Sequence, residues 1–424
     1  MKTHLSPISR PKTAAWRWPV VAIILLALAG ALRPPLAHAA TITVTAGEVA
    51  VSANDQCSLR EAIINANNDA ATHAHCTAGS GADIINLAAG PYSVTDSYAA
   101  YSGNTGLPQI ATNITINGNG ATIDRNSGTG FRLFAVSNAG NLTLNDLSLT
   151  DGAMTSDVGG GAIYNGGGTV TLNNVTLSGN NGTGSQGGGA IHANGGTTNA
   201  NDSTFTNNTE NGGGGGGGIY ANNGATVNVI DSTLTLNSAT SNLGGAIATG
   251  YSGVNNINVS GSTLNNNSAN TGGGIGIGAG TVIVTNSTIS GNTASNAGGG
   301  IAGGNGTVTL NNVTITGNTA NNQGGGVYSF ATVNYNRSIV SGNFASASYD
   351  SGYEVLNWGT DNANNDNVFG RSDITTARAF GGGSFVPGAN DVNATSDGAM
   401  PTAISSILNT TLANNGGPTQ THAL

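Results

Sequence analysis

The chain has 424 residues, of which 68 are glycine and only 7% are charged, and its formal net charge is −9. Typical soluble domains carry about 25% charged residues, so the polarity here comes mainly from Asn, Ser and Thr. The glycines follow no three-residue period, which excludes collagen. The acidic balance argues against a nucleic-acid-binding protein, because phosphate contacts need a basic face.

Residues 1–40 indicate a signal peptide for export. Basic residues from Lys2 to Arg17 come first, and residues 20–32 form an apolar run too short to span a bilayer comfortably. A small-residue cleavage site ends at Ala39. An uncleaved membrane anchor is the alternative. After cleavage, six arginines would remain against 20 acidic residues, which gives a net charge of −14.

Residues 41–82 are predicted to form an N-terminal cap that contains one short helix. Ser58 and Glu61 fit a capping box, in which each side chain bonds the other residue's backbone N–H. Apolar residues from Leu59 to Ala66 recur at helical spacing, so the helix would have one apolar face.

The only two cysteines, Cys57 and Cys76, lie in this cap. Export would place them in an oxidising compartment, so we expect a disulfide between them. The alternative is a structural zinc ion held together with His73 and His75, although the His-x-His-Cys spacing is not the usual one for zinc.

From residue 83 on, short Thr-, Ile- and Leu-rich segments separated by Gly and Asn turns predict β-strands. Between residues 159 and 348 they become regular, and a run of glycines followed by an aliphatic residue recurs. The recurring aliphatic residues from Ile163 to Val327 lie 28, 28, 28, 28, 26 and 26 residues apart. A fixed period of this length indicates a repeat architecture.

One period predicts one coil of a parallel β-helix, with three strands and three turns. In the repeat that begins at Gly300, the predicted strands are residues 300–302, 307–310 and 313–316. A single coil cannot bury its apolar side chains, so each coil needs its neighbours. The aliphatic or aromatic residues expected to point inward from the third strands are Leu177, Phe205, Leu234, Leu264, Ile289, Ile315 and Val340. We therefore predict an all-β parallel β-helix over residues 83–348, with no insertion that forms a pocket.

Asparagines recur at the turn after the third strand, at Asn180, Asn208, Asn292, Asn318 and Asn343. They could form a stripe that faces a ligand. Asn also tolerates left-handed backbone, and stacked amides can bond from coil to coil. We therefore expect a structural ladder.

Acidic residues supply the weak candidates for a metal site. Asp202 and Asp231 fall at equivalent turns of adjacent coils, where their carboxylates could bind Ca²⁺ or share a proton, or else point apart into solvent. Asp361 and Asp366 lie in an acidic, Asn-rich segment whose spacing matches no EF-hand. We predict no catalytic residue and no cofactor other than this possible calcium.

Residues 349–424 are expected to be irregular. The chain stops at Leu424 without a sorting motif or hydrophobic tail, so we expect that an anchor follows in a longer protein, of a kind that the sequence does not identify.

Three features resemble a group of bacterial surface proteins. The segment Cys57-Ser58-Leu59-Arg60-Glu61-Ala62 resembles the CSLREA domain, and the glycine repeats are similar to right-handed parallel β-helix repeats of the polymorphic outer-membrane protein type. Residues 415–424 are similar to the segment that precedes the anchor in choice-of-anchor β-helix proteins. The resemblance implies a right-handed β-helix at the cell surface or secreted, with an adhesin-like or structural role and no established catalytic residues.

We therefore expect a secreted or surface scaffold whose partners are glycans or proteins of host or neighbouring cells. The alternative is a polysaccharide-active enzyme, either a pectate-lyase-like lyase or a glycoside hydrolase, because many parallel β-helices are such enzymes. An enzyme would have to use Arg125 and Arg132 with Asp124, or the C-terminal arginines. A third hypothesis is ice or crystal binding by an aligned file of threonines: Thr176, Thr204, Thr233, Thr263, Thr288 and Thr314.

Overall fold

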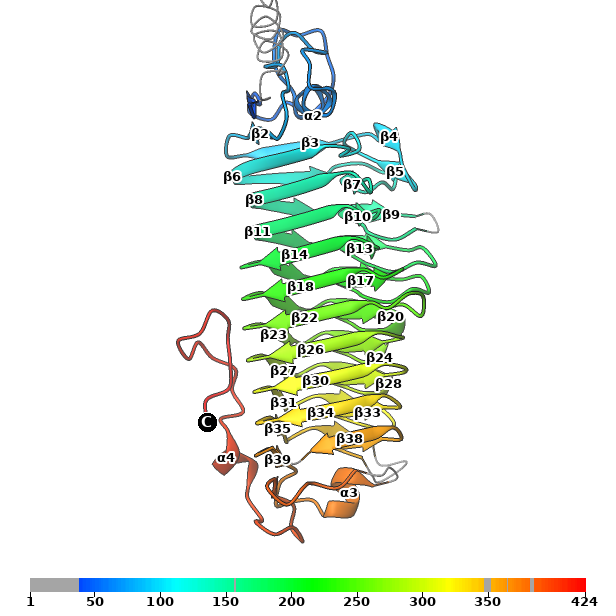
Figure 1. Cartoon of the computed structure of the whole chain (residues 1–424), viewed down its shortest axis with the longest axis vertical. Coiled ribbons are helices and arrows are strands. Elements are labelled where there is room, and N and C mark those ends of the chain that lie inside the picture. Colours follow the sequence, from blue (N-terminus) through cyan, green and yellow to red (C-terminus); the bar gives the residue numbers. More distant parts are fainter. Residues whose placement is uncertain (1–37, 156–157, 347–351, 364, 382–384) are drawn as a thin grey trace, which may run out of the picture. The chain divides into compact units, whose positions relative to one another are not determined.

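Short parallel strands stack coil upon coil in the computed structural model, which describes residues 38–155, 158–346, 352–363, 365–381 and 385–424. Residues 39–424 form one unit, a β-solenoid of about 11 coils (Figure 1). The predicted parallel β-helix is thereby confirmed. The predicted signal peptide lies outside the described residues except for its last few positions.

The repeat at residues 301–320 illustrates one coil. It consists of β29 (Ile301–Gly303), β30 (Thr307–Asn311), β31 (Thr314–Thr316) and β32 (Thr319–Ala320). The first three correspond to the predicted strands, and the structure adds a two-residue fourth strand after the asparagine turn. Each strand pairs in parallel with the equivalent strands of the neighbouring coils.

Equivalent strands build three sheets, which we call sheets 1, 2 and 3. Sheet 1 has nine strands: β7 (Phe134–Val136), β10 (Ile163–Asn165), β13 (Ile191–Asn194), β17 (Ile219–Asn222), β21 (Ile247–Thr249), β25 (Ile275–Ile277), β29, β33 (Val327–Ser329) and β37 (Val355–Asn357). Sheet 3 has eight short strands: β9 (Ala153–Met154), β12 (Asn181–Gly182), β16 (Thr209–Glu210), β20 (Ser238–Leu243), β24 (Ser268–Thr271), β28 (Thr293–Ala297), β32 and β36 (Phe344–Ala345).

Sheet 2 has 21 strands because it contains two strands, or one long bent strand, from most coils. They are β1 (Thr41–Thr43), β2 (Asp83–Asn86), β3 (Pro91–Val94), β6 (Asn113–Arg125), β8 (Asn141–Thr150), β11 (Thr169–Ser178), β14 (Thr197–Asn201), β15 (Thr204–Thr206), β18 (Thr226–Ile230), β19 (Thr233–Thr235), β22 (Asn256–Ser260), β23 (Thr263–Asn265), β26 (Thr281–Thr285), β27 (Thr288–Ser290), β30, β31, β34 (Thr332–Asn336), β35 (Ile339–Val340), β38 (Thr360–Ala363), β39 (Val368–Phe369) and β40 (Val392–Asn393). A separate antiparallel hairpin joins β4 (Ala99–Ala100) and β5 (Asn104–Thr105).

The core is a set of aliphatic files inside the coils. All seven inward residues predicted for the third strands are fully buried, and they align in register from Leu177 to Val340. Full burial of such a side chain contributes about 1.5–3 kcal/mol. The files therefore account for much of the stability, which no coil has alone.

An asparagine ladder runs beside these files. At its centre, Asn267 Nδ2 donates to Asn292 Oδ1 (2.9 Å) and to the Leu234 carbonyl (2.9 Å), while the Asn267 backbone N–H donates to the same Asn292 Oδ1. The predicted structural role is confirmed. The ladder contains the five predicted residues and two more: Asn180, Asn208, Asn237, Asn267, Asn292, Asn318 and Asn343.

Glu354 ends this ladder by taking the position of the next asparagine. Its carboxylate accepts from the backbone N–H and side-chain amide of Asn343, from the Gly342 N–H, and from the Arg371 guanidinium at 2.9 Å. Burial raises the pKa of Glu354 to about 7, although the Arg371 charge and the amide donors act to lower it.

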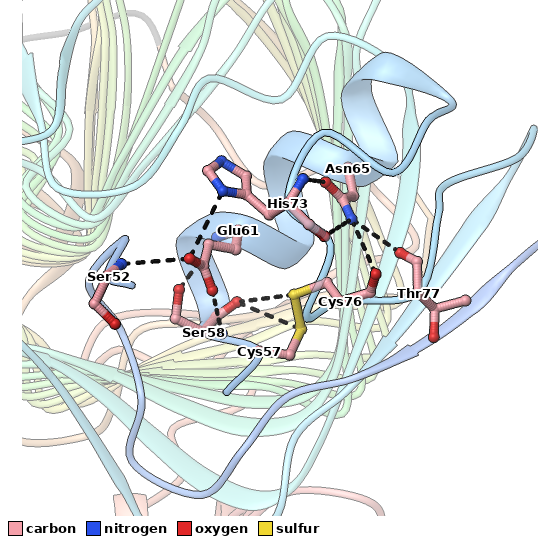
Figure 2. The surroundings of a disulfide bond; sticks show 8 residues. All are labelled: Ser52, Cys57, Ser58, Glu61, Asn65, His73, Cys76 and Thr77. Atoms are coloured by element: carbon pink, nitrogen blue, oxygen red, sulfur yellow. Dashed lines mark hydrogen bonds and ion pairs between the residues drawn. A yellow bond between two sulfur atoms is a disulfide. The ribbon is translucent and has the colours of Figure 1, made fainter. Parts of the chain in front are cut away.

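The N-terminal cap contains the predicted helix, α2 (Leu59–Asn68). Ser58 and Glu61 form the expected capping box, and Cys57 is bonded to Cys76 (Figure 2). The disulfide is thereby confirmed, and because it engages both sulfurs it rules out the zinc alternative. Asn65 donates through Nδ2 to the carbonyls of the segment that carries Cys76, which ties this segment to the helix.

The C-terminal region is more regular than predicted. Strands β37, β38 and β39 continue the ladders beyond Val340, because aliphatic and aromatic residues still point inward there. The short helix α3 (Thr376–Phe380) follows, and Phe369, Phe380 and Phe385 pack against one another at ring-centroid distances of 4.8 to 6.3 Å.

The remaining chain, with the four-residue helix α4 (Ile404–Ile407), turns back along the coils as a tail of residues 404–424 (Figure 1). Thr419 Oγ1 donates to the Gly261 carbonyl at 3.0 Å, and the Thr263 hydroxyl lies 2.8 Å from the same Oγ1. No helix among the described residues is long and apolar enough to cross a membrane.

Candidate ligand-binding groove

The predicted acidic pair, Asp202 and Asp231, lies at equivalent turns of adjacent coils, as expected. Both residues have left-handed backbone with φ of 50°, and Asp202 is exposed while Asp231 is partly exposed. Across the described residues, no three or more His, Cys, Asp or Glu side chains group closely enough to hold a metal ion. The pair belongs to a row of turn residues with left-handed backbone that also includes Asn174, Asn286 and Asn312.

The second acidic pair is divided between two environments. Asp361 lies in β38 opposite Val333, and its carboxylate accepts from Asn357 Nδ2 at 2.9 Å. Burial raises the pKa of Asp361 to about 6. Asp366 is exposed at a turn with φ of 57°. Among the described residues, the two carboxylates share no hydrogen-bond partner.

The arginines that an enzyme would need are distributed over several structural roles. Arg132 is fully buried, donates to four backbone carbonyls, and lies 4.8 Å from the centre of the Tyr164 ring. Arg125 donates to the carbonyls of nearby turns, and Arg371 pairs with Glu354 and Asp373.

The outer face of sheet 1 has a more distinctive feature. The second residues of the nine strands lie on one file, which reads Ala135, Tyr164, His192, Tyr220, Ala248, Gly276, Ala302, Tyr328 and Leu356. The first three rings stack at centroid distances of 5.4 and 5.3 Å. The next three positions have almost no side chain, and then large residues return.

His192 is fully buried among these rings, and neither ring nitrogen has a hydrogen-bond partner in the part of the chain that the structure describes. Burial, together with the positive charge of Arg132, lowers the pKa of His192 to about 3. The imidazole is therefore neutral and acts as a packing ring in the wall next to the small positions.

A groove of about 390 Å³ borders this file at Ala302, the last of the three small positions. Ala302, Gly303 and Gly304 line it together with Ile277 and with Leu243, which covers Gly276. Its aromatic residues are Tyr328 in sheet 1 and Tyr251 and Phe330 in the turns that follow sheet 1, whereas Asn242, Thr271 and Asn296 come from strands of sheet 3. Tyr251 is 69% exposed and Phe330 is 56% exposed. None of the described residues that line this groove is charged.

Turn geometry places two of these rings. The turn after β21 has six residues, 250–255, whereas the turn after β29 has three, 304–306. The longer turn projects Tyr251 from the wall. Phe330 follows β33 directly, and its ring meets Tyr328 edge-on at 5.5 Å. Trp358 occupies the equivalent position after β37 and is 52% exposed.

The expectation that no insertion forms a pocket is therefore wrong at one place. The coil that begins at β21 still has 28 residues, because a shorter connection elsewhere in that coil compensates for the longer turn. The repeat length therefore does not reveal the turn. The run of small residues at the second position of the first strands was the available signal. It emerges only when the coils are aligned strand by strand.

A second hollow, of about 410 Å³, lies between the C-terminal tail and the coils. Ile404, Leu412 and His422 line it from the tail side. The tail also buries Thr263, and the neighbouring Thr288 is nearly inaccessible. The threonine file considered for ice binding is thus aligned but interrupted by the chain's own tail.

No family model matches this chain, and neither the curated proteins nor the solved structures include a match to it.

Proposed function

We propose that this protein is an exported, adhesin-like scaffold, and that the groove on sheet 1 is where it holds a ligand. The observation that carries the proposal is the groove itself: it is lined by exposed aromatic rings, by amide and hydroxyl side chains and by Ala302, Gly303 and Gly304. Ligand sites are commonly concave and largely apolar, with a few placed polar groups. The Cys57–Cys76 disulfide agrees with export, since such bonds persist in oxidising compartments.

Membership of the CSLREA and choice-of-anchor group is part of this proposal, as is the right-handed sense of the coils. The capping box and disulfide around the CSLREA-like segment, and the tail segment that resembles the choice-of-anchor motif, support it. Surface display would bring the groove to the glycans or proteins of host or neighbouring cells.

A polysaccharide lyase or hydrolase is the second candidate. General acid–base catalysis needs a titratable group that reaches the substrate, and Tyr251 and Tyr328 are the titratable groups in the lining of the groove. The side chains that line the groove are therefore better suited to binding a sugar chain than to cleaving it, and we favour binding as the function.

The experiment expresses the full chain with its N-terminal segment in a bacterial host. We expect the protein in the exported fraction with Cys57 and Cys76 oxidised, and we expect beads coated with it to adhere to cells. Retention in the cytoplasm with free thiols, or absence of adhesion, would contradict the proposal. Release of reducing ends or unsaturated uronides from acidic glycans, abolished by Asp202→Asn with Asp231→Asn, would favour the enzyme.

A further inference from the structure

The groove has a chemical character that narrows its ligand. We propose that it binds an uncharged polysaccharide chain that runs along the stack of coils and lies against Tyr251 and Phe330. This inference rests on the proposed function and specifies the class of ligand. Three observations carry it: the exposed rings, the polar groups that line the groove with them, and the absence of charge among the described residues of the lining.

Two of the aromatic rings are exposed to solvent, which is unfavourable for large apolar side chains. Tyr251 and Phe330 are 69% and 56% exposed, although large apolar side chains elsewhere in the coils are mostly buried. A flat ring offers a large contact area at little cost in conformational entropy, which is why Tyr and Trp are enriched in binding sites. The apolar face of a sugar ring is a flat surface of matching size.

Sheet 3 supplies hydrogen-bonding groups to the groove. Asn242, Thr271 and Asn296 lie at or beside sheet 3, in successive coils. Asn296 Oδ1 accepts from Asn322, and among the described residues its Nδ2 has no protein acceptor within bonding distance. Amides and hydroxyls both donate and accept, as the hydroxyl groups of a sugar do.

Charge excludes the acidic polysaccharides. A uronate or sulfate group would need a cation or a charged donor close by, because burying an unpaired charge is costly. Among the described residues the lining of the groove contains no Arg or Lys, and the chain as a whole is acidic. An uncharged sugar chain meets no such penalty.

The orientation follows from the spacing of the rings. Tyr251 and Phe330 belong to coils that are three steps apart in sheet 1, which places them about 14 Å apart along the stack. Trp358 continues the row by one further coil. The ligand therefore runs across the coils, over a length of several sugar units.

The experiment measures binding of the full-length protein to soluble polysaccharides by affinity gel electrophoresis and calorimetry. The panel contains neutral chains (mixed-linkage β-glucan, galactomannan and α-glucan), acidic chains (polygalacturonate and alginate), and gelatin as an unfolded polypeptide. We expect at least one neutral chain to bind and the acidic chains not to bind. Affinity for the neutral chain should change less than about twofold between low and high salt, because screening acts on charges.

Four variants locate the site. Tyr251→Ala and Phe330→Ala should each weaken binding at least about fivefold, and because both side chains are exposed these variants should fold. Ala302→Tyr introduces a ring at the position that Tyr220 and Tyr328 occupy in their own coils, and it should abolish binding. Tyr98→Ala removes another exposed aromatic ring, 43% exposed, far along the sequence from the groove, and should leave binding unchanged.

The inference is overturned if no neutral chain binds, if gelatin binds in their place, or if binding survives both alanine variants. If Ala302→Tyr unfolds, the alanine variants still decide the question. If coated beads adhere to cells but the protein binds no neutral polysaccharide, this inference is wrong and the proposed function is still supported. Loss of both adhesion and polysaccharide binding would remove the two together.

Discussion

One of the titratable side chains in the regular coils has a packing role. His192 is fully buried between Tyr164 and Tyr220, and neither ring nitrogen has a partner among the described residues. An unpartnered buried polar group costs about 1–3 kcal/mol. The aromatic packing around the imidazole therefore has to outweigh a penalty that a carbon ring would avoid.

We predict that His192→Phe stabilises the protein, by about 1 kcal/mol at neutral pH. The effect grows in acid. The folded-state pKa of His192 is about 3, below its ordinary value of 6.5, so protons bind preferentially to the unfolded chain. The stability contributed by the neutral imidazole is complete above about pH 6.5 and is lost as the pH falls toward 3.

Urea unfolding of the two proteins at about pH 7 and about pH 4, on either side of the ordinary histidine pKa, measures both effects by circular dichroism. The Phe variant should show the higher midpoint, and the gap should widen in acid. An equal or smaller gap in acid would mean that His192 has a protein partner or access to water.

The role of a single residue can be predicted from the sequence when its partners are close to it in the chain. The capping box at Ser58 and Glu61 was predictable, because it depends on neighbours within one turn of helix. The disulfide could be expected from the presence of two cysteines in a segment predicted to be exported. The role of Glu354 could not, because its partners Asn343 and Arg371 approach it only after the last coils have formed.

The strands and turns were predictable as elements because the sequence repeats them. A period of 26–28 residues fixes which side chains stack, so the inward files could be named in advance. The groove depends instead on local departures from the repeat, namely a small residue, Ala302, in place of an aromatic one and one longer turn. Such departures do not change the period and become visible only when the coils are superposed.

The asparagine ladder is an element whose strength can be tested. Asn267→Leu would remove the acceptor for Asn237 and the donor for Asn292, and it would leave the Leu234 carbonyl without its side-chain donor. Each buried group left unpaired costs about 1–3 kcal/mol, so we expect a loss of about 3 kcal/mol or more.

Asn270→Leu is the matched control, because Asn270 lies in the same coil, is partly exposed and donates to Ser295 at the surface. Surface substitutions usually change stability by less than about 0.5 kcal/mol. Thermal unfolding of the two variants compares them directly. Equal midpoints would show that the buried amides add no more than exposed ones.

At the scale of the whole coil stack, stability is shared between neighbours. Ile219 is fully buried and lies between Ile191 and Ile247 in sheet 1. We expect Ile219→Asp to disrupt several coils, because it places an unpaired charge in the apolar file and each coil depends on the next. Asp202→Asn, at an exposed turn in the preceding coil, is the control.

Hydrogen exchange gives the readout for this pair of variants. Amides of β13, β17 and β21 should lose protection in Ile219→Asp and keep it in Asp202→Asn. A loss of protection confined to β17 would contradict the coupling between coils.

The C-terminal tail gives the coil stack a further property. Ile404 and Gly342 line one hollow together, while Thr419 reaches Gly261, three coils nearer the N-terminus. The tail thus bridges coils that otherwise contact only their immediate neighbours. Unfolding that starts at the last coil would first have to detach the tail, so we expect these coils to unfold together. A pulling force applied at Leu424 would act on the tail contacts before it acts on the groove.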